Sequence, residues 1–347
     1  MSQTVSSEAR SRLPMIEVPP FPPSAEYFEA AFDERAVFDF AKESVMGVVQ
    51  VSRGSAVRIK RVSLGRIAIP SGEVLVTDPS YLGYGSDEER PLQKRVAPGD
   101  YEVVLSACTS SDKIVMINMV KLIIQEDVGP LSYVPALKAD EDPSAVKPHG
   151  FASVGVDTGV ACLADYREAI TYGMRLQDHI YRPEGSGTYG AFAAQNEKLP
   201  GLVYFESGTG DGGYPCFWGI GPMGETTCLV VDFETLGLCP LAKAIFPLSE
   251  SLVGMPLTHE VFEKCGYHFR LEHIEGVLCL VGDELAAGEA RIYDERSTVI
   301  GDTRRNPSTQ SGKQTIRYMR EVVSLPINGT LEIEVSLPYK PFPFRRE

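Results

Sequence analysis

Residues 202–236 read LVYFESGTGDGGYPCFWGIGPMGETTCLVVDFETL and hold the pattern on which the fold depends. Residues 202–205 and 214–218 are rich in aromatic and β-branched side chains, and residues 226–233 form a continuous apolar run. Such compositions favour β-strands, and glycine-rich segments separate them here. The stretch therefore predicts a strand, a glycine loop, a second strand, a turn and a third strand.

The glycine loop, residues 207–213, contains four glycines around a single acidic residue, Asp211. Glycine adopts positive φ easily and lets the backbone approach a partner closely. A hairpin turn of about two to five residues rarely requires so many. We therefore predict that the loop and the aromatic residues beside it form a binding site. The predicted binding residues are Ser207, Gly208, Gly210, Asp211, Gly212, Gly213, Tyr214 and Trp218.

Two familiar motifs are incomplete in this stretch. Three of the glycines match G-x-G-x-x-G, but a dinucleotide site needs a helix next, and Tyr214 and Pro215 open a strand instead. A G-x-S-x-G nucleophile elbow is also incomplete, because Phe205 stands where the first glycine belongs. Cys216 offers a nucleophile in principle, but a free cysteine more often packs as a small apolar residue, here under Trp218.

Composition and charge bound the class of protein. The chain has 347 residues, 43% of them hydrophobic, and a formal net charge of −14. This charge opposes nucleic-acid binding, which depends on Lys and Arg neutralising phosphates, and it suits a basic partner protein. Seven cysteines occur singly, as in a reducing compartment. We find no apolar leader and no run of membrane-spanning length, so we expect a cytoplasmic protein that binds no membrane.

The rest of the chain is predicted to be β-rich. Residues 1–23 are polar and then proline-rich, which predicts an extended arm. Ser24 is a plausible N-cap for a short helix, and Asp165, with Glu168 three positions later, predicts the N-cap of the longest helix. From residue 48 onward apolar and polar residues alternate, as in half-buried antiparallel strands.

The predicted fold class is mainly β, or β-rich α+β. Antiparallel sheets would form a sandwich or a partly open barrel with one short-to-medium helix. The C-terminal part repeats the strand pattern and has a hairpin signal at Asn328 and Gly329. We therefore predict three parts: the arm at 1–23, a β-rich domain at 24–236, and a C-terminal β-sandwich-like domain at 237–347.

Four blocks of sequence, in order, resemble the bacterial domain of unknown function 4241 family. They are SLGRIAIPSGEVLVTDP (63–79), VAPGDYEVVLS (96–106), GVDTGVACLAD (155–165), and FESGTGDGGYPCFWG (205–219) with LVVDFETL (229–236). The resemblance covers about residues 28–236 and implies a compact β-rich domain. It also implies that four aspartates occupy recurrent acidic positions of the family: Asp78, Asp157, Asp211 and Asp232. It implies no reaction.

Two functions are open at this point. We favour a non-enzymatic, acidic interaction protein that binds a partner protein in a neutralising (immunity-like) or sensing role. The alternative is a hydrolase that depends on a divalent cation held by the four aspartates, with Asp211 and Asp157 as first choices for ligand or general base. Aspartate is also the default residue of turns, so the residues alone do not decide. We predict no other cofactor.

Overall fold

The computed structural model describes most of the chain after the predicted N-terminal arm. The described residues are 22–39, 44–46, 49–51, 56–110, 113–143, 153–180, 189–192, 201–208, 210–238, 241–282, 287–303, 308–311, 314–319, 325, 328–337 and 340–347. The arm predicted at 1–23 lies almost wholly outside them. The described part is mainly β and built from antiparallel sheets, which confirms the predicted fold class. None of its helices has the length and apolarity to cross a membrane.

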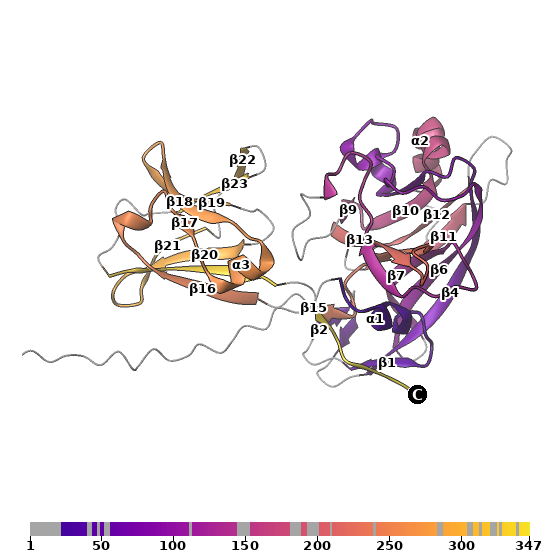
Figure 1. The fold of residues 1–347 in the computed structure, drawn as a ribbon, viewed down its shortest axis with the longest axis horizontal. Helices are drawn as coiled ribbons and strands as arrows, with labels where there is room; N and C mark the ends of the chain where they lie inside the picture. Colours follow the sequence, from indigo (N-terminus) through magenta and orange to yellow (C-terminus); the bar gives the residue numbers. More distant parts are fainter. Residues whose placement is uncertain are drawn as a thin grey trace, which may run out of the picture. The chain divides into compact units, whose positions relative to one another are not determined.

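The chain divides into two compact units (Figure 1). The first unit comprises residues 20–238 together with residues 339–347. The second unit comprises residues 239–338. The last residues of the sequence therefore lie in the first unit, next to its N-terminal strand.

A nine-stranded antiparallel sheet forms the centre of the first unit. Its strands, in spatial order, are β26 (Phe344–Arg346), β1 (Ala36–Asp39), β4 (Ala56–Ile69), β6 (Gly99–Ser110), β7 (Lys113–Ile123), β14 (Thr226–Asp232), β13 (Gly212–Ile220) and β8 (Ser132–Pro135), with β9 (Ser153–Val156) also paired to β13. A four-stranded sheet contains β11 (Tyr189–Phe192), β12 (Leu202–Glu206), β10 (Val160–Asp165) and β5 (Val74–Thr77). Two short ribbons pair β2 (Ser44–Met46) with β3 (Val49–Val51) and β15 (Gly237–Leu238) with β25 (Lys340–Pro341).

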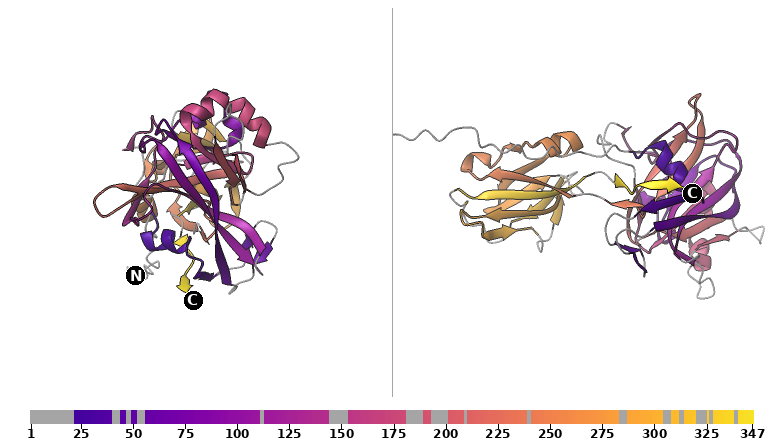
Figure 2. Two further views of the ribbon diagram at one scale, coloured as in Figure 1. Left: turned by 90° about the vertical axis from the view of Figure 1, so that its right-hand side faces the viewer. Right: turned by 90° about the horizontal axis from the view of Figure 1, so that it is seen from below.

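The first unit has four layers (Figure 2). The main apolar core fills the space between the two sheets and includes Phe205, Trp218 and Phe233. Helix α1 (Ala25–Ala30) packs on the other face of the nine-stranded sheet, and α2 (Tyr166–Ile180) packs on the outer face of the four-stranded sheet. Two 3-10 turns, η1 (Pro79–Tyr81) and η2 (Asp87–Glu89), follow β5.

Both predicted helix N-caps are confirmed. The Ser24 hydroxyl accepts the backbone N–H of Tyr27 at 3.2 Å, which satisfies a donor that the first helical turn leaves unpaired. The Asp165 carboxylate accepts the N–H groups of Arg167 at 3.0 Å and Glu168 at 3.1 Å. Helix α2 is the longest helix in the described part of the chain.

The strands predicted in residues 202–236 are confirmed as β12, β13 and β14. However, β12 pairs with β10 and β11, whereas β13 pairs with β14, β8 and β9. The glycine loop is therefore not a hairpin turn but a crossing from one sheet to the other. The hairpin is formed by β13 and β14.

The second unit consists of two antiparallel sheets around a core of its own. One sheet contains β16 (Leu241–Pro247), β24 (Thr330–Ser336), β20 (Ala287–Tyr293) and β21 (Val299–Asp302). The other contains β17 (Pro256–Leu257), β18 (Phe269–Ile274), β19 (Val277–Gly282), β23 (Gln314–Tyr318) and β22 (Ser308–Ser311). Helix α3 (Glu260–Cys265) and the 3-10 turn η4 (Glu250–Leu252) lie between strands of these sheets in the sequence. The arrangement is consistent with the predicted C-terminal β-rich region.

Candidate functional site

The glycine loop is braced by hydrogen bonds at its base. Ser207 is fully buried, and its backbone N–H donates to the carbonyl of Gly159 at 3.0 Å. Its hydroxyl donates to the carbonyl of Gly210 at 2.7 Å. The Tyr214 hydroxyl donates to the same carbonyl, also at 2.7 Å. These bonds tie both ends of the loop to its middle and to the turn after β9.

Gly208 is required by packing inside the protein. Its φ is +63°, and a Cβ added there would lie 2.7 Å from the Cβ of Phe233 and 2.9 Å from Cγ2 of Thr235. Gly210 also has positive φ, +109°, but a Cβ at that position would meet open space. The close approach predicted for these glycines is therefore made by Gly208, and the neighbour is the protein's own core.

A buried carboxylate supports the turn next to the loop. Asp78, fully buried at the end of β5, accepts at Oδ2 the N–H groups of Asp157 and Thr158, both at 2.8 Å, and the Thr158 hydroxyl at 2.9 Å. At Oδ1 it accepts the N–H of Ser80 at 2.7 Å. Burial by itself raises the pKa of Asp78, but these hydrogen bonds outweigh burial, and the pKa lies below its ordinary value. Asp78 is an anion that fixes a turn.

Asp157 and Asp211 lie at the same end of the β9–β13 ladder. Gly212 pairs with Val156, so these two aspartates are the next residues on the facing strands. Both are exposed. The Tyr81 hydroxyl donates to Oδ2 of Asp157 at 2.5 Å, and this hydrogen bond raises the pKa of Tyr81. We call this surface the acidic tip: Asp157, Thr158, Gly210 and Asp211.

Asp232 lies in a different environment from the other predicted aspartates. It is buried at the end of β14 and contacts α1, where the Tyr27 hydroxyl donates to its Oδ2 at 3.3 Å. Its Oδ1 accepts the N–H of Glu234 at 2.8 Å. Burial raises the pKa of Asp232 well above its ordinary value. Among the residues that the structure describes, no group of three or more His, Cys, Asp or Glu side chains is arranged to hold a metal ion.

The aromatic residues of the predicted binding site are core residues. Tyr214 is 4% exposed and Trp218 is 2% exposed, and both belong to the core between the two sheets. The Tyr214 ring packs edge-on against Phe233, with 5.0 Å between ring centroids. Cys216 is also buried there, and burial raises the pKa of its thiol. The exposed part of the predicted site is therefore its loop tip, with Asp211, Gly212 and Gly213.

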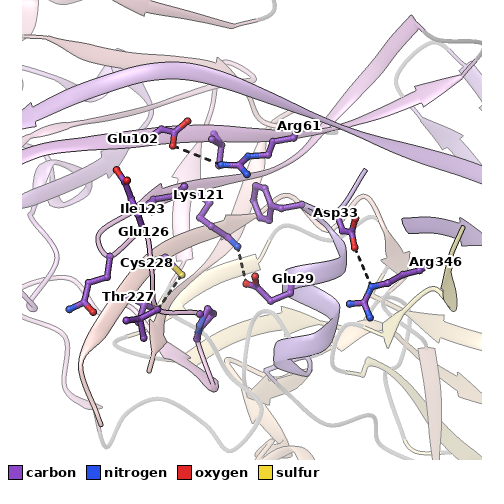
Figure 3. A pocket seen from close by; sticks show the side chains of 16 residues that line it. Glu29, Asp33, Arg61, Glu102, Lys121, Ile123, Glu126, Thr227, Cys228 and Arg346 are labelled. Carbon is purple, nitrogen blue, oxygen red and sulfur yellow. Dashed lines mark hydrogen bonds and ion pairs between the residues drawn. The ribbon is translucent and has the colours of Figure 1, made fainter. Parts of the chain in front are cut away.

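A second candidate location was missed from the sequence. A cavity of about 510 Å³ lies beside α1 on the face of the nine-stranded sheet that this helix covers (Figure 3). At its wall the Lys121 Nζ donates to Oε1 of Glu29 at 2.9 Å, and the Tyr133 hydroxyl donates to the same oxygen at 2.9 Å. Lys121 is 7% exposed, and its Nζ lies 4.3 Å from the centroid of the Phe32 ring. The one signal in the sequence was a lysine inside the apolar run of a predicted strand.

Comparison with known proteins finds a family match across most of the first unit. Residues 67–231 match the family described as Protein of unknown function (DUF4241), which confirms the resemblance found in the sequence. The matched segment contains Asp78, Asp157 and Asp211, and it ends one residue before Asp232. No curated protein and no solved structure matches the chain.

Proposed function

We propose that this chain, which matches the DUF4241 family over residues 67–231, is a non-enzymatic interaction protein that binds a partner protein at the acidic tip. We place it in the cytoplasm, in a neutralising (immunity-like) or sensing role. The observation that carries the proposal concerns two turns, the glycine loop that carries Asp211 and the β9–β10 turn that carries Asp157. They are hydrogen-bonded to each other, and the second is also hydrogen-bonded to the buried carboxylate of Asp78.

The bonding of these turns fixes the charges that they present. The Ser207 N–H and the Gly159 carbonyl join the two turns, and Asp78 fixes the backbone of the turn that carries Asp157. Burying a carboxylate costs free energy unless hydrogen bonds compensate, and the bonds to Asp78 supply that compensation. A surface that is already ordered loses less conformational entropy on binding, which favours affinity.

The chemistry of the tip favours a cationic group on a protein. Asp157 and Asp211 offer carboxylates, which bind Lys or Arg side chains through charge-assisted hydrogen bonds. The formal net charge of −14 steers a basic partner toward the chain and repels nucleic acid. Six cysteines in the described residues are free and buried, which supports a reducing location such as the cytoplasm. They are Cys108, Cys162, Cys216, Cys228, Cys265 and Cys279.

Charge reversal at the tip tests the proposal. We expect the wild-type chain to capture a basic protein from cells of its source, and the double variant Asp157→Lys/Asp211→Lys to lose it. The matched control is Glu250→Lys/Glu295→Lys, which makes the same change of charge at two exposed positions of the second unit. With the captured protein purified, titration calorimetry should show binding weakened about 100-fold or more in the tip variant alone.

Two results would contradict the proposal. One is capture of the same proteins by the tip variant and the wild type. The other is a melting temperature that rises with Mg²⁺ or Mn²⁺ in the wild type but not in the tip variant. A ligand that binds only the folded chain raises its melting temperature. That second result would favour the metal-dependent hydrolase.

A further inference from the structure

The cavity beside α1 has a floor in which charged and apolar side chains alternate. Four floor residues come from the paired strands β6 and β7, where Val104 faces Lys121 and Glu102 faces Ile123. Each strand contributes residues two apart, which point to one face of a sheet. The four residues therefore form the corners of a square, with the charged side chains of Glu102 and Lys121 at one pair of opposite corners and the apolar side chains of Val104 and Ile123 at the other.

Three ion pairs surround this floor, as Figure 3 shows. Besides the Lys121–Glu29 pair, an Arg61 nitrogen lies 3.9 Å from a Glu102 oxygen, and the Arg346 Nε lies 3.2 Å from Oδ2 of Asp33. The accessible charges are of both signs: the Arg61 and Arg346 side chains are each 47% exposed, the Glu29 side chain is 42% exposed and the Glu126 side chain is 62% exposed. The Lys121 side chain, which pairs with Glu29, is only 9% exposed.

The arrangement selects among ligands by charge. A simple anion would be attracted by Arg61 and Arg346 and repelled by Glu29, Glu102 and Glu126, and a simple cation would meet the reverse. A molecule with one charge of each sign interacts favourably with both, and apolar lining at Ile123 and Val128 accommodates a hydrocarbon side chain. The volume, about 510 Å³, is within the range of roughly 300–1,000 Å³ that is typical of small-ligand sites.

We propose that this cavity binds a short peptide zwitterion, with the ligand's ammonium group on Glu29 and its carboxylate on Arg61. Lys121 and the Tyr133 hydroxyl act as positioning residues, because both donate to Oε1 of Glu29 and hold that carboxylate in place. The site is independent of the acidic tip, so its occupation requires no partner protein.

Blocking the two ends of one peptide tests each charge separately. The probes are the dipeptides Ala-X, with X each standard amino acid, followed by the N-acetylated and the C-amidated form of the best binder. In titration calorimetry with the full chain, we expect the free dipeptide to bind, and each blocked form to bind about tenfold or more weakly, because each lacks one charge-assisted contact.

Two variants assign the ends of the ligand. Arg61→Gln should weaken the free dipeptide but leave the binding of the C-amidated form unchanged, because that form has no carboxylate to lose. Glu29→Gln should show the complementary pattern with the N-acetylated form. Arg345→Gln, which removes an exposed arginine paired with Asp39 and Glu347 outside the cavity, is the control. If Glu29→Gln unfolds because Lys121 loses its partner, the exposed Arg61 variant decides alone.

Three outcomes overturn the proposal. The first is the absence of binding across the whole panel at millimolar concentration. The second is equal binding of the free and blocked forms, which would show that the charges are not used. The third is displacement of the dipeptide by acetate or inorganic phosphate at equal concentration, which would show a site for anions in general.

Discussion

Asp78 and Asp232 are both buried at strand ends, yet they are opposite in charge behaviour. Asp78, on the four-stranded sheet, accepts hydrogen bonds from the backbone N–H groups of Ser80, Asp157 and Thr158 and from the side chains of Ser80 and Thr158, and its pKa is lowered. Asp232, on the nine-stranded sheet beneath α1, accepts from one N–H and one hydroxyl, and its pKa is raised. At Asp78 the hydrogen bonds outweigh the effect of burial on the pKa, whereas at Asp232 burial, together with the nearby Glu234 charge, outweighs the two hydrogen bonds.

This difference indicates that the two aspartates have different roles in the first unit. An anion with its donors arranged around it holds the turn that carries Asp157, so its loss would disorder the acidic tip. Asp232, whose pKa is raised, makes two hydrogen bonds, to the Tyr27 hydroxyl and the Glu234 N–H, and holds no exposed turn. Two buried aspartates at strand ends of one unit therefore need not share a role.

The largest effect is expected from Asp78→Asn. The amide keeps the size but presents N–H groups toward donors, so free energy of unfolding should fall by about 3 kcal/mol at neutral pH. The lowered pKa gives the sign of the pH dependence. The stabilisation by Asp78 is present above its ordinary pKa of 3.8 and is lost as the pH falls through the folded value. Urea denaturation at neutral and acid pH measures the loss of stability and its dependence on pH. Equal stability of variant and wild type at neutral pH would show that Asp78 does not stabilise the turn.

A smaller effect is expected at Gly208, where the loop passes the core. Gly208→Ala places a Cβ against Phe233 at positive φ and should cost about 2 kcal/mol. Gly210→Ala is the matched control, because its φ is also positive but its Cβ would meet open space, and about 1 kcal/mol is expected. Denaturation curves of the two variants measure the difference. An equal loss of stability in both would show that backbone conformation alone, and not the contact with Phe233, requires glycine at position 208.

The smallest effect is expected from Asp232→Asn. A carboxyl with a raised pKa stabilises the fold below its ordinary value of 3.8, and this contribution is lost as the pH rises through the folded pKa. At neutral pH the neutral amide should therefore leave stability within about 1 kcal/mol of the wild type or increase it. On acidification the wild type should gain relative to the variant. A loss as large as that of Asp78→Asn would erase the contrast between the two aspartates.

Local chemistry made part of this structure predictable. The N-caps Ser24 and Asp165 act on residues two or three positions away, and strand alternation is visible within a few residues. The glycine enrichment that marks the loop around Asp211 is likewise a local signal, and the structure shows the tip of that loop to be exposed. The core location of Trp218 was not, since aromatic residues suit interfaces and cores alike.

Contacts between distant residues could not be predicted in this way. Asp78 meets Asp157 across 79 positions, and Glu29 meets Lys121 across 92. The crossing of the glycine loop between sheets depends equally on remote strand partners. Residues 344–346 were assigned to the C-terminal domain by continuity, whereas the structure pairs them with β1.

That pairing has a consequence for synthesis on the ribosome. Phe38 of β1 faces Phe344 of β26, so this edge of the sheet is incomplete until roughly 300 further residues have been translated, about 15–60 s at ordinary elongation rates. Residues 241–337, which have their own core, emerge during that interval and can fold first. Until β26 has emerged, this edge of β1 stays unpaired, and nascent chains that stall before residue 344 would be the ones most exposed to chaperones.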